Sequence, residues 1–204
     1  VLDRTKEPGS IGEPLYLDVV AALSTSEFKN VTVLSGRYGL GSKDTTPAQI
    51  VAVYNNTDKK RFTIGINDDV THLSLQEGPS IVTTPKGTVN CKFWGLGADG
   101  TVGANKNSIK IIGDNTDKYA QAYFDYDSKK SGGVTMSHLR FGDQPIKSTY
   151  LIKRANFVAC HNPSYMTKFN MVQELVDGGT FLLNCTWSKD EVENHIPGQV
   201  KKYM

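Results

Sequence analysis

The stretch TVNCKFWGLGADGTVGANKNSIKIIG, residues 88–113, decides the fold of the second half of the chain. Residues 89–94 are mostly apolar and rich in β-forming types, so they predict a short buried strand. Gly95, Gly97 and Gly100 follow directly with G-x-G-x-x-G spacing. Glycines let the backbone turn sharply and approach a neighbour closely, which predicts a tight turn after the strand.

A helix is expected to follow this turn. Residues 101–112 have helical spacing, with Val102, Ile109 and Ile112 on the side that would be buried. Gly113 is a plausible helix end, because glycine is common just past the last turn of a helix. The whole stretch is therefore predicted as strand, glycine turn and helix.

A phosphate or pyrophosphate site is the functional interpretation of the glycine turn. The first N–H groups of a helix have no partner within the helix, and phosphates often bind in front of them. A bare glycine pattern is a weak signal, but a strand before it and a helix after it support the interpretation. The alternative is a purely structural turn.

The composition shows no global bias toward a particular class of partner. The 204 residues are 38% hydrophobic and 22% charged, with a formal net charge of +2, which gives no argument for nucleic acid or a membrane surface. No run approaches the ~18 apolar residues that a membrane span requires, and VLDRTKEPGS is not a signal peptide. Three widely spaced cysteines without a C-x-x-C pair disfavour a metal or disulfide framework and suggest a reducing compartment.

The first part of the chain alternates strands and helices. It opens on Val1-Leu2-Asp3, without an initiator Met and with the pattern of a strand's end, so we expect a piece of a longer polypeptide. Helices are predicted over residues 13–23 and 47–54, and strands over residues 31–34 and 62–66. This rhythm is typical of a parallel α/β sheet.

A second α/β unit is predicted after a linker. Residues 76–87 contain two prolines and two glycines and are interpreted as the linker between residues 1–75 and residues 88–204. Further strands are predicted at residues 118–125, 134–141, 156–160, 180–184 and 200–204, and helices at residues 166–176 and after the capping box of residues 188–191. The predicted fold class is α/β, with two Rossmann-like units of mainly parallel sheets, both truncated.

A second polar turn is expected beside the glycine turn. In a doubly wound sheet, the turn after the second strand lies next to the turn after the first. Asp125 or Asp127 would suit ribose hydroxyls there, and Lys129 and Lys130 would suit a further phosphate. The alternative is a solvated turn that happens to carry two lysines.

The residues alone indicate no catalytic or metal-binding constellation. G-x-S-x-G, H-E-x-x-H and G-x-x-x-x-G-K-[ST] are absent, and the four histidines have no ligand-like spacing. His138 lies within a predicted strand, where a lone histidine is more often a packed residue than a ligand. A ligand-binding module without a catalytic residue or a metal site is therefore favoured over a self-sufficient catalyst.

Long motifs along nearly the whole chain carry a family resemblance. They are VLDRTKEPGSIGEPLYLDV (1–19), GRYGLGSKDTTPAQIVAVYNN (36–56), RFTIGINDDVTHLSL (61–75), CKFWGLGADGTVGANKNSIKIIGDNTDKYAQAYFDYDSKKSGGVTMSHLRFG (91–142), FVACHNPSYMTKF (157–169) and GGTFLLNCTWS (178–188). Together they resemble pyruvate:ferredoxin (flavodoxin) oxidoreductase. The resemblance implies that residues 1–75 correspond to the latter part of that enzyme's second domain and residues 88–204 to most of its third, gamma-like domain.

The resemblance also implies an activity and a ligand. The complete enzyme would oxidatively decarboxylate pyruvate to acetyl-CoA with thiamine diphosphate, Mg and iron–sulfur clusters, none of which this segment would hold, and would pass electrons to ferredoxin or flavodoxin. It would be a cytoplasmic homodimer, or an organellar one in an anaerobic eukaryote. The third domain of the family binds coenzyme A, and the residues that match its site are Gly97, Ala98, Asp99, Gly100, Thr101 and Lys129.

Three hypotheses follow for the segment itself. It holds the nucleotide end of coenzyme A and contacts the other domains of the same enzyme. Alternatively, it is an NAD(P)-binding module, argued from the glycine pattern with Asp125 or Lys129 downstream. The third hypothesis is a structural fragment without ligand affinity, because truncation at both ends would leave sheet edges exposed.

Overall fold

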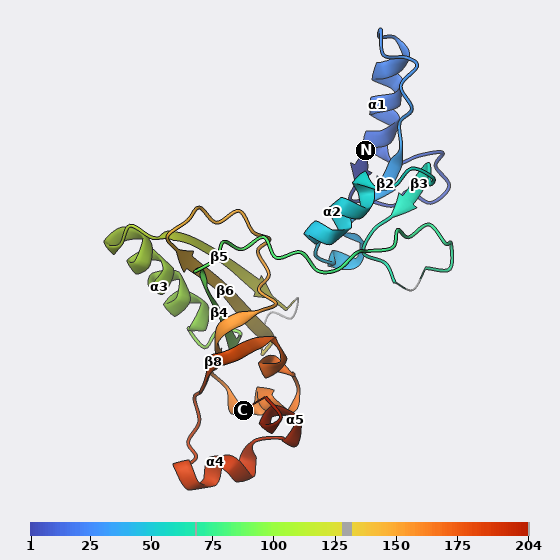
Figure 1. Ribbon diagram of the computed structural model, residues 1–204. Helices are drawn as coiled ribbons and strands as arrows, with labels where there is room; N and C mark the ends of the chain where they lie inside the picture. The colour runs from blue at the N-terminus through green and yellow to red at the C-terminus, as the bar shows by residue number, and fades with distance from the viewer. Residues whose placement is uncertain (68, 128–131, 204) are drawn as a thin grey trace. The chain divides into compact units, whose positions relative to one another are not determined.

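The computed structural model describes residues 1–67, 69–127 and 132–203, which form two compact units (Figure 1). Unit 1 comprises Val1–Val82 and unit 2 comprises Thr83–Met204. Both units combine strands and helices, and the predicted α/β class is confirmed.

Unit 1 is built on a three-stranded parallel sheet in the order β1-β2-β3. Its strands are β1 (Leu2–Asp3), β2 (Ser35–Arg37) and β3 (Arg61–Thr63). The segments that connect them contain α1 (Pro14–Ser24), the 3₁₀ turn η1 (Leu40–Ser42) and α2 (Pro47–Tyr54). The predicted succession of strand end, helix, strand, helix and strand is confirmed.

Buried carboxylates hold the start of α1 against this sheet. Asp3 of β1 accepts hydrogen bonds from the backbone N–H groups of Leu15 and Tyr16 at 3.0 and 3.2 Å. Glu13, the residue just before the helix, is buried and forms an ion pair with Arg37 of β2. These contacts satisfy N–H groups that the first turn of a helix leaves unpaired.

The predicted strand at residues 31–34 is wrong, because the strand forms at Ser35–Arg37. Gly36 lies at its centre, and the side chains of Phe62 and Leu2 occupy the space that a Cβ atom at this position would take. The strand therefore forms where two side chains pack closely on a glycine. A run of apolar residues in the sequence does not indicate such packing.

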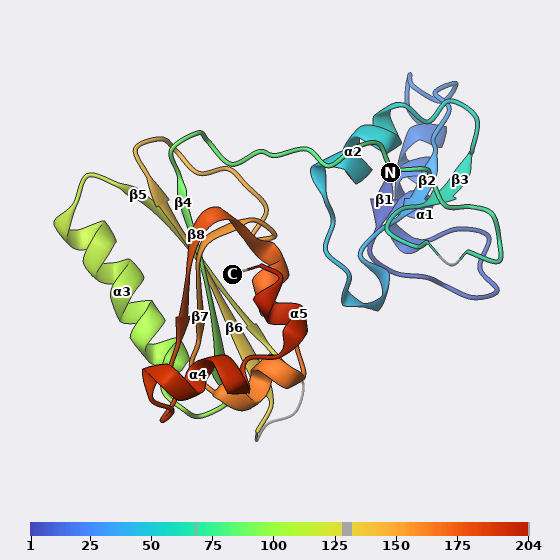
Figure 2. The ribbon, with the colours of Figure 1, turned by 60° about the horizontal axis from the view of Figure 1, so that its bottom comes forward.

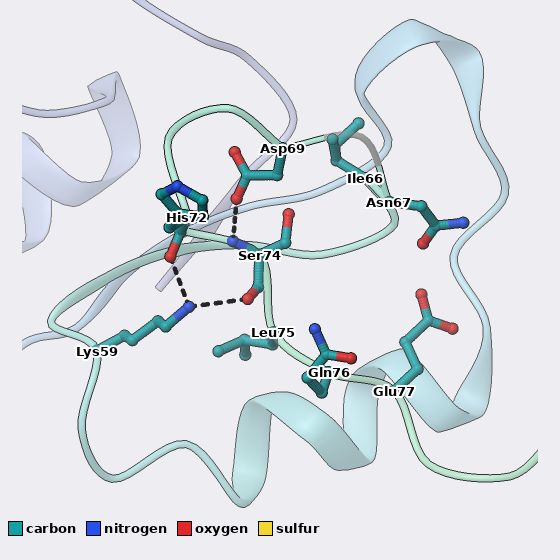
Figure 3. Close-up of a pocket in the computed structure, with 9 residues that line it drawn as sticks. All are labelled: Lys59, Ile66, Asn67, Asp69, His72, Ser74, Leu75, Gln76 and Glu77. Atoms are coloured by element: carbon teal, nitrogen blue, oxygen red, sulfur yellow. Dashed lines mark hydrogen bonds between the residues drawn. The ribbon is translucent and has the colours of Figure 1, made fainter.

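A cavity of about 590 Å³ lies in unit 1 beside the loop that follows β3 (Figure 3). Lys59 donates hydrogen bonds to the carbonyl oxygens of His72 and Ser74 at 2.7 and 2.9 Å. Asp69 accepts one from the Ser74 N–H at 2.5 Å. These two charged groups of the cavity wall are thus engaged in holding the loop.

Unit 2 contains a five-stranded sheet in the order β5-β6-β4-β7-β8. Its strands are β4 (Val89–Leu96), β5 (Tyr119–Tyr126), β6 (Val134–Gly142), β7 (Ala155–Cys160) and β8 (Leu175–Leu183). β6 runs antiparallel to β4 and β5, whereas the β4–β7 and β7–β8 pairs are parallel. Four strands therefore share one direction and β6 runs opposite to them, so this sheet is mixed, whereas mainly parallel sheets were predicted.

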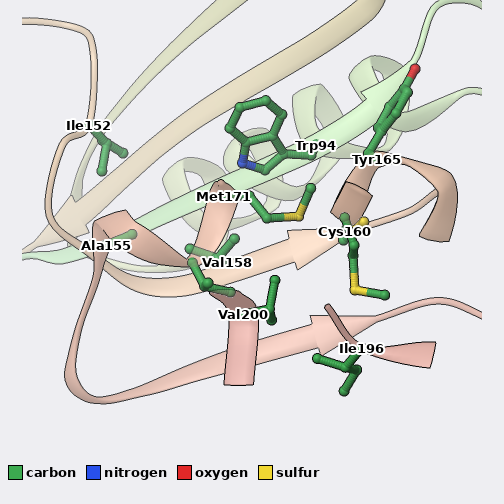
Figure 4. Close-up of a cluster of buried hydrophobic side chains, with 11 residues drawn as sticks. Trp94, Ile152, Ala155, Val158, Cys160, Tyr165, Met171, Ile196 and Val200 are labelled. Carbon is green, nitrogen blue, oxygen red and sulfur yellow. The ribbon is translucent and has the colours of Figure 1, made fainter. Parts of the chain in front are cut away.

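One face of this sheet is covered by α3, the other by the C-terminal part of the chain (Figure 2). The helical elements are α3 (Thr101–Asn115), α4 (Lys189–His195), α5 (Gly198–Lys201) and the 3₁₀ turns η2 (Pro163–Thr167) and η3 (Met171–Glu174). On the C-terminal side, Trp94 and Cys160 of adjacent strands pack with Met171 and Val200 in an apolar cluster (Figure 4). This cluster is the main core of unit 2.

Arg140 of β6 is buried and binds mainly backbone carbonyls. Its guanidinium group donates to the carbonyl oxygens of residues 149–151 at 2.6–3.2 Å and to the side chains of Asn90 and Gln121 at 3.0 and 2.7 Å. Among the described residues it has no carboxylate partner, and burial lowers its pKa. Arg140 therefore fastens the segment between β6 and β7 to the sheet.

His138 is a packed residue, as predicted. It is buried, and its Nδ1 accepts a hydrogen bond from the Ile152 N–H at 3.0 Å. Burial, together with the charges of Lys92 and Arg140, lowers its pKa to about 3. The imidazole is therefore neutral near pH 7.

The predicted helix at residues 166–176 is wrong. This segment contains parts of two 3₁₀ turns and the start of β8. Asn170, between the turns, has φ −85° and ψ 68°, which is not helical. Leu175 pairs with Ala155 of β7, and Gly178, at φ 73°, lies where the register shifts. Strand pairing thus outweighs the helical spacing of the apolar residues.

Two predictions at element ends are also wrong. α3 continues to Asn115, so Gly113 lies inside the helix rather than at its end. Residues 200–204 were expected to begin a strand, but α5 ends at Lys201, and Val200 is fully buried in the apolar cluster. In contrast, the capping box of Ser188 and Glu191 at the start of α4 is confirmed.

Gly95→Ala is expected to destabilise the chain by about 1–3 kcal/mol, because the added Cβ would lie 2.5 Å from Thr101 Oγ1. Urea unfolding, monitored by circular dichroism, measures this change in the free energy of unfolding. Gly113→Ala is the matched control. It has no atom within 4 Å of the new Cβ and lies in a helix, so it should stabilise by about 0.5–1 kcal/mol. Equal effects of the two changes would contradict close packing of α3 on β4.

Candidate functional site

The glycine turn between β4 and α3 is held tightly against the turn that precedes β6. The Gly97 N–H donates a hydrogen bond to the Gly133 carbonyl oxygen at 2.7 Å, and a Cβ at residue 97 would lie 3.2 Å from that oxygen. Ala98 and Gly100 both have positive φ, 73° and 85°. This conformation is uncommon for a residue other than glycine, so the turn is a constrained one.

Asp99 closes the turn with its side chain. Its carboxylate accepts hydrogen bonds from the N–H groups of Leu96 and Thr101 at 2.7 and 2.8 Å. Burial raises the pKa of this carboxyl, but the hydrogen bonds from Thr101 and Leu96 outweigh burial and lower the pKa below its usual value. Asp99 therefore acts inside the turn, in the manner of a helix cap.

Four backbone N–H groups around the start of α3 are left without a protein partner. Within the described residues, the amides of Ala98, Gly100, Val102 and Gly103 donate no hydrogen bond. Two of them belong to the first turn of a 15-residue helix, where the helix dipole also favours negative charge. This arrangement is suited to an anion such as a phosphate.

A cavity of about 340 Å³ lies directly beside these amides. One wall consists of residues 96–100 with Val102 and Gly103, and the other of Tyr126, Asp127 and residues 133–135. The turn after β5 thus meets the glycine turn, as the sequence predicted. The strands themselves are not adjacent, because β6 lies between β4 and β5.

The predicted site residues fall into three groups. Gly97, Ala98, Asp99 and Gly100 line the cavity, whereas Thr101 is buried below it. Asp127 also lines the cavity. Asp125 does not, because its register partner Met136 belongs to the opposite face of the sheet. Lys129 and Lys130 lie outside the described residues.

His161 is brought to this site from a distant part of the chain. Its ring Nδ1 lies 2.8 Å from Thr101 Oγ1, and its backbone N–H donates a hydrogen bond to the Trp94 carbonyl oxygen at 2.9 Å. The sequence analysis found no ligand-like spacing among the four histidines and did not connect His161 to Thr101. The order of β4 and β7 in the sheet, which makes the contact, is not visible in the sequence.

Neither a metal site nor a membrane span is found in the part of the chain that the structure describes. No group of three histidine, cysteine, aspartate or glutamate residues there could hold a metal ion. None of the described helices is long and apolar enough to cross a bilayer.

Comparison with known proteins decides the family. The family model described as pyruvate ferredoxin/flavodoxin oxidoreductase matches residues 90–203. The chain belongs to this family. The matched region contains the glycine turn, α3 and the strands that line the cavity.

Named relatives in the oxidoreductase family align with almost the whole chain. Pyruvate:ferredoxin oxidoreductase of Moorella thermoacetica is 61% identical over 99% of this chain. Pyruvate-flavodoxin oxidoreductase of Enterobacter agglomerans is 56% identical over 100% of it. Pyruvate dehydrogenase [NADP(+)] of Cryptosporidium parvum is 52% identical over 98% of it. The chain spans only 18%, 18% and 11% of these relatives.

A solved structure is also similar in part. The pyruvate oxidoreductase subunit PORC of Thermotoga maritima aligns with 54% of this chain and 57% of its own, at 18% identity and a TM-score of 0.46.

Asp99→Ala is expected to lower the free energy of unfolding by about 1 kcal/mol at pH 7, because two N–H groups lose their acceptor. The lowered pKa means that this contribution is present above the ordinary aspartate pKa of about 4 and is lost as the pH falls through the lowered pKa. Urea unfolding of both forms between pH 7 and pH 2.5 measures the difference.

The control is Asp117→Ala, which removes an exposed carboxylate from the loop after α3. It should change stability by less than about 0.5 kcal/mol at every pH. A difference between wild type and Asp99→Ala that persists undiminished at the lowest pH would contradict a role for the ionised carboxylate.

Proposed function

We propose that this chain is a segment of a 2-oxoacid oxidoreductase that converts pyruvate to acetyl-CoA and reduces ferredoxin or flavodoxin, and that its unit 2 binds the nucleotide end of coenzyme A. The names of the relatives support the oxidoreductase activity. The observation that carries CoA binding is the set of four unpaired amides at the start of α3, which belong to residues that line a cavity.

The chemistry of the ligand fits this arrangement. CoA contains a diphosphate, whose oxygens accept hydrogen bonds from backbone amides and gain from the dipole of α3. Gly97 and Gly100 would permit close approach of the diphosphate. The ionised carboxylate of Asp99 is engaged within the turn, where it accepts hydrogen bonds from two backbone amides. By fixing the nucleotide end, the segment would orient the thiol for acyl transfer elsewhere in the enzyme.

The redox cofactors of such an enzyme do not fit this segment. Burial raises the pKa of the Cys91 and Cys160 thiols to about 11, so these side chains behave as small apolar residues rather than thiolate ligands. We therefore assign the iron–sulfur clusters to other parts of the complete enzyme. We assign Mg and thiamine diphosphate there too, because the described residues contain no group of three histidine, cysteine, aspartate or glutamate residues that could hold a metal ion. The same proposal assigns the other domains, the electron carriers and a second subunit as partners.

Calorimetric titration of the 204-residue chain with CoA, with NADP as the comparison ligand, tests the proposal. Selective binding of CoA supports it, and selective binding of NADP would favour the NAD(P)-binding alternative instead. If the chain binds neither ligand although circular dichroism shows that it is folded, the result would favour the hypothesis of a structural fragment without ligand affinity.

Lys129 is the proposed partner of the ribose 3′-phosphate of CoA. Lys129→Ala should weaken CoA binding roughly tenfold, because a charge-assisted contact to phosphate is lost. It should affect dephospho-CoA much less, since that ligand lacks the 3′-phosphate. Titration with both ligands gives the comparison.

Lys110→Ala is the control for a general loss of positive charge, because Lys110 is exposed on α3 outside the cavity wall. It should leave both affinities within about twofold. Equal losses for CoA and dephospho-CoA in Lys129→Ala would reject the assigned contact.

A further inference from the structure

The interface between α3 and the sheet contains polar side chains that have no partner. Asn105 of α3 and Thr135 and Ser137 of β6 are 3%, 6% and 0% exposed. Among the described residues, Asn105 Nδ2, Thr135 Oγ1 and Ser137 Oγ form no hydrogen bond. Buried polar atoms are nearly always hydrogen-bonded, so each unpaired one requires an explanation.

The strand register places Thr135 and Ser137 on the side of the sheet that faces α3. Thr135 is the register partner of Gly95 in β4, the residue on which Thr101 of α3 packs. Ser137 follows two residues later in the same strand, and alternate residues of a strand share a face. The hydroxyl groups of Thr135 and Ser137 therefore belong to the same strand, lie on the same face of the sheet and are similarly buried.

Only one of these two residues lines the cavity. Thr135 lines the cavity beside the glycine turn, whereas Ser137 does not. Tyr126, the register partner of Thr135, and Val102 of α3 also line this cavity, and aromatic and apolar side chains suit a flat base. The unpaired amides of the turn line the same cavity and suit a diphosphate.

We infer that Thr135 is a binding residue for the nucleoside part of a nucleoside diphosphate held in this cavity. The diphosphate accepts hydrogen bonds from the free amides at the start of α3, and the nucleoside lies over the end of β6, where it pairs with the Thr135 hydroxyl. A hydroxyl can both donate and accept, so it can meet either kind of polar atom on the nucleoside. The inference rests on the proposed function, because it specifies the nucleotide end of the same ligand.

The test titrates the 204-residue chain with ADP and, separately, with inorganic pyrophosphate. Thr135→Val, which removes only the hydroxyl, should weaken ADP binding about threefold to tenfold, the value of one neutral hydrogen bond. Pyrophosphate binding should be unchanged, because it engages only the amides. Thr135→Ser should retain the affinity for ADP.

Ser137→Ala is the matched control and should leave the affinity for both ligands unchanged. Thermal unfolding without ligand separates binding from folding. Thr135→Val should be at least as stable as wild type, because an apolar group replaces an unpaired buried hydroxyl.

Three outcomes would overturn the inference. If Thr135→Val binds ADP as tightly as wild type, Thr135 does not contact the nucleoside, and CoA binding by the segment still stands. If it loses ADP and pyrophosphate equally, Thr135 shapes the turn instead of contacting the nucleoside. If the folded wild-type chain binds neither of these ligands nor CoA, the proposed function falls together with the inference.

Discussion

The close approach of α3 to β4 is the constraint on which unit 2 depends. Gly95 leaves no room for a side chain, because Thr101 occupies that space. Thr101 in turn lies within hydrogen-bonding distance of His161 at the end of β7, so the start of the helix is tied to two strands. This contact determines where the free amides point and where the cavity opens. The geometry of the proposed binding site is thus a consequence of helix packing.

The two faces of the unit 2 sheet differ in character, and the difference matches their tasks. Trp94, Cys160 and Val200 form an apolar cluster on one face, which gives that side its stability. On the other face, the fully buried side chains of α3 are polar, Thr101 and Asn105. An interface rich in unpaired polar atoms contributes less to folding. Of the unpaired residues Asn105, Thr135 and Ser137, only Thr135 lines the cavity of the proposed site.

The sequence allowed the local elements of the site to be predicted, but not the contacts across the sheet. The run from Val89 through the glycines to α3 was predicted correctly, because β-propensity, glycine spacing and helical periodicity are all local signals. The position of Thr135 and the contact of His161 depend on strand order and register, which are not local. Register also explains the error at Asp125, whose side chain faces away from the cavity. Strand pairing also explains why the helix predicted from the spacing of apolar residues at 166–176 does not form. The end of this segment pairs with β7 instead.

Arg140 has a consequence for how this part of the protein can vary. Its guanidinium group recognises residues 149–151 through their carbonyl oxygens, which every amino acid possesses. The side chains of those residues are therefore free to change without loss of the attachment, whereas no other side chain supplies five N–H donors from one planar group. The two sides of this contact should consequently differ in the substitutions that they tolerate. Residues 149–151 should accept many side chains, whereas Arg140 should accept none.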